Sequence, residues 1–140
     1  EFDRLVVRRR DPVPGDYEYE LRIPGTVYVR EAETTFRAEI IACDGNPNCP
    51  DRVLVDAAAI GPYVKIRNWK PGDYYRPVGL PAGKLKKLFQ RARIPRSQRA
   101  RWPVLVSDSS IVWAASFPVS REFIACGQSQ KVVAFETLRA

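Results

Sequence analysis

Apolar and charged side chains alternate strictly over residues 17–23, which read Tyr-Glu-Tyr-Glu-Leu-Arg-Ile. Successive side chains of a β-strand point to opposite faces, so this period of two predicts a strand with one buried face. Segments that are rich in β-branched residues and bounded by turn residues predict further strands. These segments are 27–30, 35–41, 52–56, 63–67, 104–106, 111–115 and 131–138. The chain is therefore expected to fold mainly as short strands.

Two segments have the composition of tight turns. Ile23-Pro24-Gly25-Thr26 fits a type II turn, because proline presets the first central φ and glycine accepts a positive φ at the second position. We expect this turn to close a hairpin. Ser107-Asp108-Ser109-Ser110 is typical of a second hairpin turn. A sheet edge at 63–67 would project two cations, Lys65 and Arg67.

The period of the apolar residues changes between residues 83 and 93. Here they follow the i, i+3, i+4, i+7 spacing of one helical face, and basic residues fill most other positions. The apolar stripe consists of Leu85, Leu88, Phe89 and Ala92. Pro95 breaks this helix and suits the first position of a second, short one, which Trp102-Pro103 should terminate. The expected class is α+β, a β-rich domain (sandwich-like or a mixed sheet) with two short tandem basic helices at about 83–101.

The length of 140 residues is that of a single domain with one core. We expect residues 1–60 to be a β-rich segment that leads into this domain or forms part of it, and residues 61–140 to form the domain itself. The chain begins at Glu1 and contains no methionine, so we interpret it as a piece of a longer protein.

The chain contains no histidine, which excludes Ser-His-Asp triads, His-ligated zinc, haem with a proximal histidine and imidazole general bases. It also lacks the phosphate-binding loops GxxxxGKS/T and GxGxxG. Its acids are scattered over expected strand faces and turns, so we predict no catalytic residue and no metal site. No apolar run approaches the roughly eighteen residues of a membrane span, and the N-terminus has no secretory pattern. We therefore expect a soluble, cytoplasmic protein.

Three cysteines are too few for a disulfide framework, and no two of them are spaced as CxxC. Cys43 and Cys49 flank a turn-rich loop that a disulfide or a metal could close. The alternative, which we favour for a cytosolic protein, is a surface hairpin loop with reduced thiols. We expect Cys126 to be small core filler. A thiol enzyme built on Cys43 or Cys49 would need a base, and the chain has no histidine.

Positive charge is concentrated in residues 65–101. Twelve basic residues accompany a single acid there, Asp73, so the segment carries +11 whereas the whole chain carries +7. A charge run on a solvated helix face is normally interleaved with acids that relieve the repulsion, and here these acids are missing. We therefore predict a polyanionic partner. Arginine and lysine in this excess fit the phosphates of a duplex or a structured RNA better than a stacked single strand.

Asp73 follows Gly72 in an expected turn. We interpret it as a group that caps backbone N–H groups or orients a nearby arginine rather than as an acid–base catalyst. Aromatic residues also accompany the basic segment: Trp69, Tyr74, Tyr75, Phe89 and Trp102. We expect Phe89 and Trp102 in the core. For the other three, exposure for base stacking and packing beneath the helices both stay open.

Short motifs follow one another in a specific order between residues 64 and 113. They are Val64-Lys65-Ile66-Arg67, Pro71-Gly72-Asp73, Pro77-Val78-Gly79, Lys84-Leu85-Lys86-Lys87-Leu88-Phe89, Ile94-Pro95, Arg99, Pro103-Val104-Leu105 and Ile111-Val112-Trp113. In order and spacing they closely resemble the C-terminal domain of bacterial tRNA(Ile)-lysidine synthetases. The resemblance is strongest over residues 61–138, and the stretch 21–25 is similar to the segment just before that domain.

The resemblance implies a module of an ATP-dependent ligase that adenylates a wobble cytidine of tRNA and joins lysine to it. In that family catalysis belongs to a separate N-terminal PP-loop domain with an SGGxDS-type motif, which this sequence lacks. The implied role of this chain is non-catalytic: it holds tRNA, expected to be tRNA(Ile), towards the acceptor stem. The implied fold is akin to an RNA-side domain of the phenylalanyl-tRNA synthetase β chain.

The same resemblance sets expectations about cofactors and partners. No cofactor is expected in this chain, whereas ATP and Mg²⁺ are expected in the parent enzyme. The implied partners are tRNA and the N-terminal PP-loop catalytic domain. No membrane partner is implied, and a homodimer of the parent is left open.

By matching positions, the resemblance implies RNA contacts at Arg67, Lys84, Lys86 and Arg99, with Pro71, Gly72 and Asp73 as a structural motif. The charge pattern adds Lys65, Arg76, Lys87, Arg91 and Arg96 to the expected contacts. Two positions depart from the family pattern. Tyr74 stands where arginine is common, and Gly83 stands where lysine is often found. These departures put one or two phosphate contacts in doubt.

Other functions compatible with the charge pattern are a stand-alone module for structured RNA and a basic docking surface for an acidic protein or an anionic membrane. A membrane surface would call for a longer amphipathic helix with several exposed large apolar residues. An SGGxDS motif upstream of Glu1 would separate the lysidine synthetase interpretation from a stand-alone module.

Overall fold

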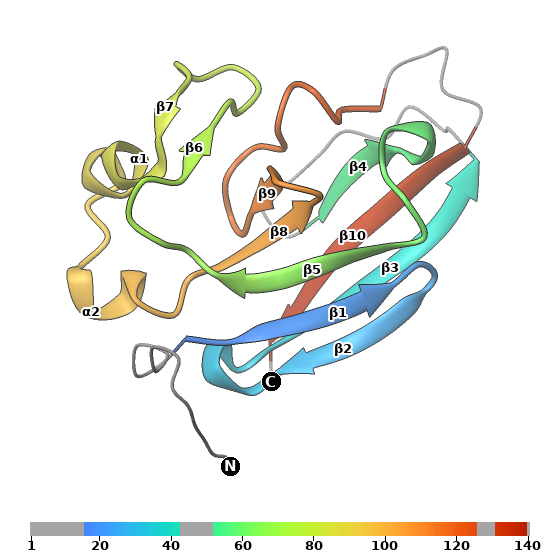
Figure 1. Cartoon of the computed structure of the whole chain (residues 1–140), viewed down its shortest axis with the longest axis horizontal. Coiled ribbons are helices and arrows are strands. Elements are labelled where there is room, and N and C mark those ends of the chain that lie inside the picture. Colours follow the sequence, from blue (N-terminus) through green and yellow to red (C-terminus); the bar gives the residue numbers. More distant parts are fainter. Residues whose placement is uncertain (1–15, 43–51, 126–130, 140) are drawn as a thin grey trace, which may run out of the picture.

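In the computed structural model, residues 16–42, 52–125 and 131–139 are described, and they form two four-stranded sheets and one two-stranded sheet (Figure 1). The first sheet has the order β1-β5-β8-β9, formed by Glu18–Arg22, Tyr63–Asn68, Pro103–Ser107 and Ser110–Ala114. The second has the order β2-β3-β10-β4, formed by Gly25–Val29, Thr34–Ala42, Lys131–Arg139 and Arg52–Asp56. The small sheet pairs β6 (Tyr74–Tyr75) with β7 (Gly83–Lys84). The helices are α1 (Leu85–Arg91), α2 (Arg96–Arg99) and the 3₁₀ turns η1 (Arg30–Ala32) and η2 (Ala57–Ala59).

One hydrophobic core is shared by the two four-stranded sheets. Trp113 from the first sheet and Phe36 and Phe135 from the second are fully buried in it. Phe36 meets Trp113 edge-on at a ring-centroid distance of 6.3 Å. Every strand pair among the described residues is antiparallel. The prediction of a β-rich chain with few helices is confirmed, and its two large sheets are antiparallel rather than mixed.

The turn predicted at Ile23–Thr26 is a corner between the sheets and not a hairpin. β1 pairs with β5 while β2 pairs with β3, so the two consecutive strands join different sheets. Gly25 has no positive φ, which a type II turn needs at its second central position, so the type II prediction was wrong. Gly25 serves a close approach instead, since a Cβ atom there would lie 2.6 Å from the carbonyl oxygen of Arg22. Each strand can then turn its apolar side towards the shared core.

β5 is an interior strand, which corrects the expectation of a cationic sheet edge. It lies between β1 and β8. Val64 and Ile66 enter the core, while Lys65 and Arg67 project from the opposite face. The alternation along β5 predicted these two faces correctly. It carried no information about β1, whose pairing with β5 joins distant parts of the sequence.

α1 is shorter than the apolar period predicted. Residues 83–84 pair with β6 as strand β7, so the helix begins at Leu85. Arg93 has a φ of 58°, which turns the chain out of the helix. Ala92 is therefore an exposed C-cap and not part of the buried stripe. In α2, Pro95 is the N-cap rather than the first helical residue.

α1 packs on the first sheet through a second cluster of buried side chains. Phe89 is fully buried at its centre. The rings of Trp69, Trp102 and Phe117 surround it at centroid distances of 5.1, 5.5 and 5.9 Å. Trp69 and Trp102 are thus packing residues, and the helix has a fixed place on the sheet.

Cys43, Cys49 and Cys126 lie outside the described residues, so the expectations about their thiols stay predictions. Within residues 16–42, 52–125 and 131–139, no helix is long and apolar enough to cross a bilayer.

Candidate nucleic-acid interface

Five of the predicted contacts lie at the end of the molecule that holds α1 and α2, with α1 beside the β6–β7 pair (Figure 1). They are Lys84 on β7, Lys86, Lys87 and Arg91 on α1, and Arg96 on α2. All five residues are exposed. In the described part of the chain, none of their side chains has a carboxylate within 4.0 Å or a hydrogen-bond partner. We call these five residues the basic helical surface.

The sequence of α1 explains why its cations face outward. Its leucine and phenylalanine side chains occupy the face that packs on the sheet, which leaves Lys86, Lys87 and Arg91 on the solvent side. Neither helix contains an acid, so the i, i+4 ion pairs that usually relieve such a run cannot form within them. The repulsion among these cations is therefore not relieved by an acid within either helix.

The turn at Lys70–Asp73 anchors the beginning of α1. Gly72 has a φ of +95°, a conformation that favours glycine. The Lys70 N–H donates to Asp73 Oδ2 at 2.7 Å, and the Asp73 N–H donates to the Lys70 carbonyl at 3.0 Å. The Asp73 carbonyl in turn accepts from the Leu85 N–H at 2.9 Å. Asp73 therefore joins the turn to the first residue of the helix.

Arg67 is held by the same carboxylate. Its Nη1 and Nη2 each donate to Asp73 at 3.0 Å, and Nη1 also donates to the Asn68 carbonyl at 2.9 Å. The side chains of Arg67 and Asp73 are only 19% and 13% exposed. A phosphate would have to displace this bidentate carboxylate to reach Arg67. The structure thus sets Arg67 apart from the basic helical surface.

Arg99 also has internal partners. Its Nε donates to the Ile94 carbonyl at 2.7 Å. Its guanidinium carbon lies 6.0 Å from the centre of the Phe89 ring, within the range of a cation–π contact. Arg99 therefore fastens α2 to α1 and is only partly accessible.

The two remaining predicted contacts, Lys65 and Arg76, are exposed and loosely paired. Lys65 Nζ lies 3.6 Å from Glu18, and Arg76 Nε lies 4.0 Å from Glu122. All four side chains are about half exposed or more. Exposed pairs of this kind contribute roughly 1 kcal/mol or less, so a phosphate can replace either carboxylate at little cost.

We expect the variant Asp73→Ala to lose about 2 kcal/mol of unfolding free energy. It would leave the mostly buried Arg67 guanidinium without its partner and remove a cap of the turn. Urea denaturation measures the loss. The control is Glu20→Ala, which breaks an exposed pair with Arg22 and should cost less than about 1 kcal/mol. Equal costs for both variants would contradict a structural role for Asp73.

β6 turns one tyrosine inward and the next one outward. Tyr75 is fully buried, its hydroxyl donates to the Pro118 carbonyl, and burial raises its pKa. Tyr74 is 53% exposed and stands opposite Lys84 in the β6–β7 register. The guanidinium carbon of Arg76 lies 5.7 Å from the centre of the Tyr74 ring. Of the aromatics in the basic segment, Tyr74 is thus the one that is open for stacking.

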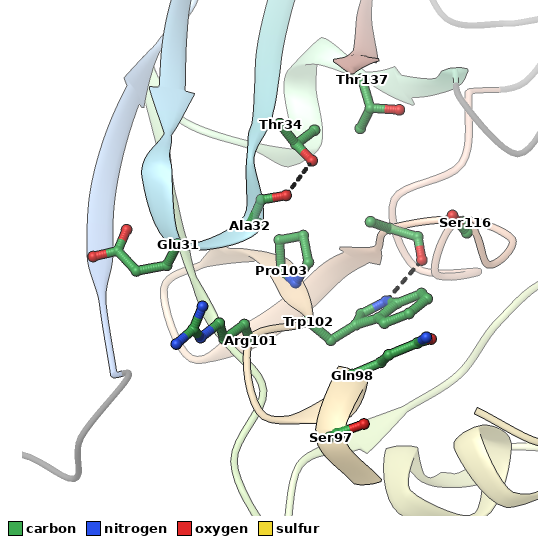
Figure 2. A pocket seen from close by; sticks show the side chains of 11 residues that line it. Glu31, Ala32, Thr34, Ser97, Gln98, Arg101, Trp102, Pro103, Ser116 and Thr137 are labelled. Atoms are coloured by element: carbon green, nitrogen blue, oxygen red, sulfur yellow. Dashed lines mark hydrogen bonds between the residues drawn. The ribbon is translucent and has the colours of Figure 1, made fainter. Parts of the chain in front are cut away.

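A pocket of about 260 Å³ lies beside α2 (Figure 2). Trp102 and Pro103 form one side, and Gln98 and Arg101 bring polar groups from α2 and the residues after it. The Trp102 indole N–H is already used, because it donates to the Ala115 carbonyl at 2.8 Å. The sequence interpretation did not single out Gln98 and Arg101 as a pair, and Arg101 lies after the end of α2, so no helical spacing in the sequence points to them.

Glu31 is the carboxylate of this pocket. The Tyr19 hydroxyl donates to it at 2.6 Å and, with the nearby charges of Arg30 and Arg101, holds the pKa of Glu31 below its usual range. A carboxylate that stays ionised near neutral pH is a poor general acid. Across the described ranges, no three or more His, Cys, Asp or Glu side chains form a group that could hold a metal ion.

Comparison with known proteins gives a consistent assignment. The family described as "TilS substrate C-terminal domain" matches residues 64–135. The tRNA(Ile)-lysidine synthase of Solibacter usitatus is 35% identical over 133 residues, which cover 94% of this chain and 29% of that protein. The tRNA(Ile)-lysidine synthase of Clostridium acetobutylicum is 26% identical over 136 residues, which cover 92% of this chain and 29% of that protein. The chain thus spans less than a third of the length of these relatives.

A solved structure has the same fold. It is described as a crystal structure of the TilS C-terminal domain, and it matches with a TM-score of 0.78 at 24% sequence identity. The match covers 89% of this chain and 97% of the solved one. The segment before residue 61 is therefore included in large part in the shared fold.

Proposed function

Since the chain belongs to the family of tRNA(Ile)-lysidine synthase C-terminal domains, we propose that it binds tRNA through the basic helical surface. The observation that carries the proposal is the set of five exposed cations without a carboxylate partner among the described residues. Backbone phosphates supply the missing negative charge, and their binding releases counterions. The two tandem basic helices act as one platform that grips structured RNA by its phosphates and shape.

The predicted contacts divide into three groups under this proposal. The basic helical surface makes the main phosphate contacts. Lys65 and Arg76 join from the flank by exchanging their exposed carboxylate partners for phosphates. Arg67 and Arg99 are positioning residues, because they hold the turn before α1 and the contact between the helices.

The parent protein is proposed to be the ligase that forms lysidine from a wobble cytidine, with ATP and lysine as co-substrates. We infer that its chemistry, with ATP and Mg²⁺, belongs to an N-terminal PP-loop domain and that this chain is non-catalytic. The expected RNA is tRNA(Ile), held towards its acceptor stem, and the expected compartment is the cytoplasm. We propose residues 16–139 as one folding unit in place of a domain that begins at residue 61, because strands from both parts share each large sheet.

A binding titration of the chain with tRNA(Ile) at several salt concentrations tests the proposal. If about four phosphates are neutralised, log K should fall against log salt with a slope between about −3 and −4. An RNA duplex should show a similar slope, because the platform reads phosphates. An affinity that does not respond to salt would contradict phosphate binding. Competition of anionic vesicles or an acidic polypeptide at equal charge concentration, with no preference for RNA, would favour a general docking surface.

A further inference from the structure

Tyr74 is not explained by phosphate binding. At 53% exposure it is the most exposed large apolar or aromatic side chain in the described ranges. A tyrosine ring exposes apolar area that a soluble domain usually buries or uses in recognition. Tyr74 lies on β6, whose partner strand β7 carries Lys84 of the basic helical surface, so recognition is the more specific explanation of its exposure.

The ring of Tyr74 is held in place by its neighbours. The next residue of β6, Tyr75, is anchored in the core by a hydrogen bond to Pro118. Cross-strand pairing places Lys84 opposite Tyr74, and directly opposed side chains of an antiparallel pair lie within about 5.5 Å at Cβ. Arg76 approaches the ring from the same segment at 5.7 Å. An aromatic platform therefore stands between two cations.

A groove of about 420 Å³ opens next to this platform. That volume is within the range of sites for small organic ligands, about 300 to 1,000 Å³. Tyr74 and Arg76 line it together with Ser109, in the turn between β8 and β9, and Ser110, the first residue of β9. The serine hydroxyls can both donate and accept hydrogen bonds, as the edges of a nucleobase require.

The charges that line the groove favour a ligand with a single negative charge. Two arginines, Arg67 and Arg76, face two carboxylates, Asp73 and Glu122, so the lining itself is balanced. Lys84 is not part of the lining, but it stands opposite Tyr74 in the β6–β7 register and adds one positive charge beside that residue. The single excess positive charge can neutralise one phosphodiester, but it cannot neutralise the several negative charges of a free polyphosphate.

We propose that this groove binds one unpaired nucleotide of the RNA that the basic helical surface holds. The base stacks on Tyr74, and its phosphate lies between Arg76 and Lys84. A base within a duplex has both faces covered by its neighbours, so the exposed ring selects an unpaired nucleotide at the end of a stem. This inference rests on the proposed RNA binding and names the RNA feature that is read.

The test compares a blunt RNA duplex with the same duplex carrying a short single-stranded extension, at its 3′ end or at its 5′ end. For the wild-type chain, one of the extensions should raise the affinity about tenfold. Part of the gain should persist as salt is raised, because stacking on Tyr74 releases no counterions, whereas the part that comes from the phosphate between Arg76 and Lys84 should fade. Tyr74→Leu should remove the part of the gain that persists at high salt and leave the affinity for the blunt duplex unchanged. Tyr74→Phe should show the same gain in affinity as the wild-type chain, because the aromatic ring remains.

Two controls separate the groove from other surfaces. Tyr28→Leu alters a tyrosine of similar exposure (48%) on β2 and should keep the gain. Gln98→Leu alters the pocket of Figure 2 and should keep it as well. Loss of the gain in Gln98→Leu but not in Tyr74→Leu would place the base in that pocket and overturn the inference.

The outcomes also distinguish this inference from the function on which it rests. Equal wild-type affinity for the blunt duplex and both extended duplexes would overturn the nucleotide site and leave phosphate binding intact. Absence of binding to all of these RNAs would overturn both.

Discussion

Replacing Lys86 and Lys87 together with glutamate should weaken the binding of tRNA by about 100-fold. Both side chains are exposed and unpaired within the described residues, so each substitution removes a charge-assisted phosphate contact, worth on the order of 1 kcal/mol or more, and adds repulsion. The slope of log K against log salt should become less steep by about 2. Both residues lie in the first turn of α1, where glutamate is favoured by the helix dipole. Loss of the helix is therefore not an expected cause.

The matched control changes the same amount of charge elsewhere. Arg22 and Lys131 are exposed at the end of β1 and the beginning of β10. Their joint replacement with glutamate should reduce the affinity only by the weak long-range effect of net charge, which screening limits to about 8–10 Å at physiological salt. Similar losses for the two double variants would mean that RNA responds to overall charge and not to the basic helical surface.

Phe89→Ala should destabilise the domain by about 3–5 kcal/mol, because it empties the centre of the cluster that holds α1 on the first sheet. Three aromatic rings would lose their common neighbour, and collapse around the cavity is limited by the sheet beneath. Guanidinium denaturation measures the change. Leu138→Ala, at an exposed position of β10, should cost less than about 1 kcal/mol.

The same variant separates stability from binding. Under conditions in which Phe89→Ala is still folded, the cations of α1 keep their charge but lose a rigid base. We expect tRNA binding to weaken with an unchanged salt slope, since the number of phosphate contacts stays the same. A variant with full stability would show that the ring cluster is not what fixes the helix.

Local sequence predicted most strands, either from a period of two, as in β5, or from a run of buried apolar residues, as in β4, β8 and β9. β3, β4 and β10 lie within a residue or two of the segments that their β-branched composition indicated. The hairpin at Ser107–Ser110 was also predicted correctly, since a hairpin turn depends on residues that are adjacent in sequence. The same reasoning failed at Ile23–Thr26, because the choice between a hairpin and a corner depends on partners elsewhere in the chain.

The charge pattern of the sequence located the candidate interface, but it did not distinguish the cations that are free to bind a phosphate from those that have partners within the protein. Lys87, Arg91 and Arg96 were added from composition alone, and they lie on the unpaired surface. Arg67 and Arg99 look the same in sequence, yet Asp73 and the Ile94 carbonyl occupy their donors. Only side-chain geometry separates a cation with an internal partner from a cation without one. The exposure of Tyr74 depended in the same way on the unpredicted pairing of β6 with β7.

The place of β10 in the second sheet has a consequence for protein synthesis. β10 is paired with β3 on one side and β4 on the other, so these two earlier strands have no ladder between them until residues 131–139 exist (Figure 1). Until β10 is made, the apolar face of the first sheet also lacks the part of the shared core that β10 contributes. On a ribosome, which makes the chain from its N-terminus, the cations of α1 and α2 are therefore translated well before the fold that orients them is complete. We expect these cations to reach their final geometry only after β10 has left the exit tunnel.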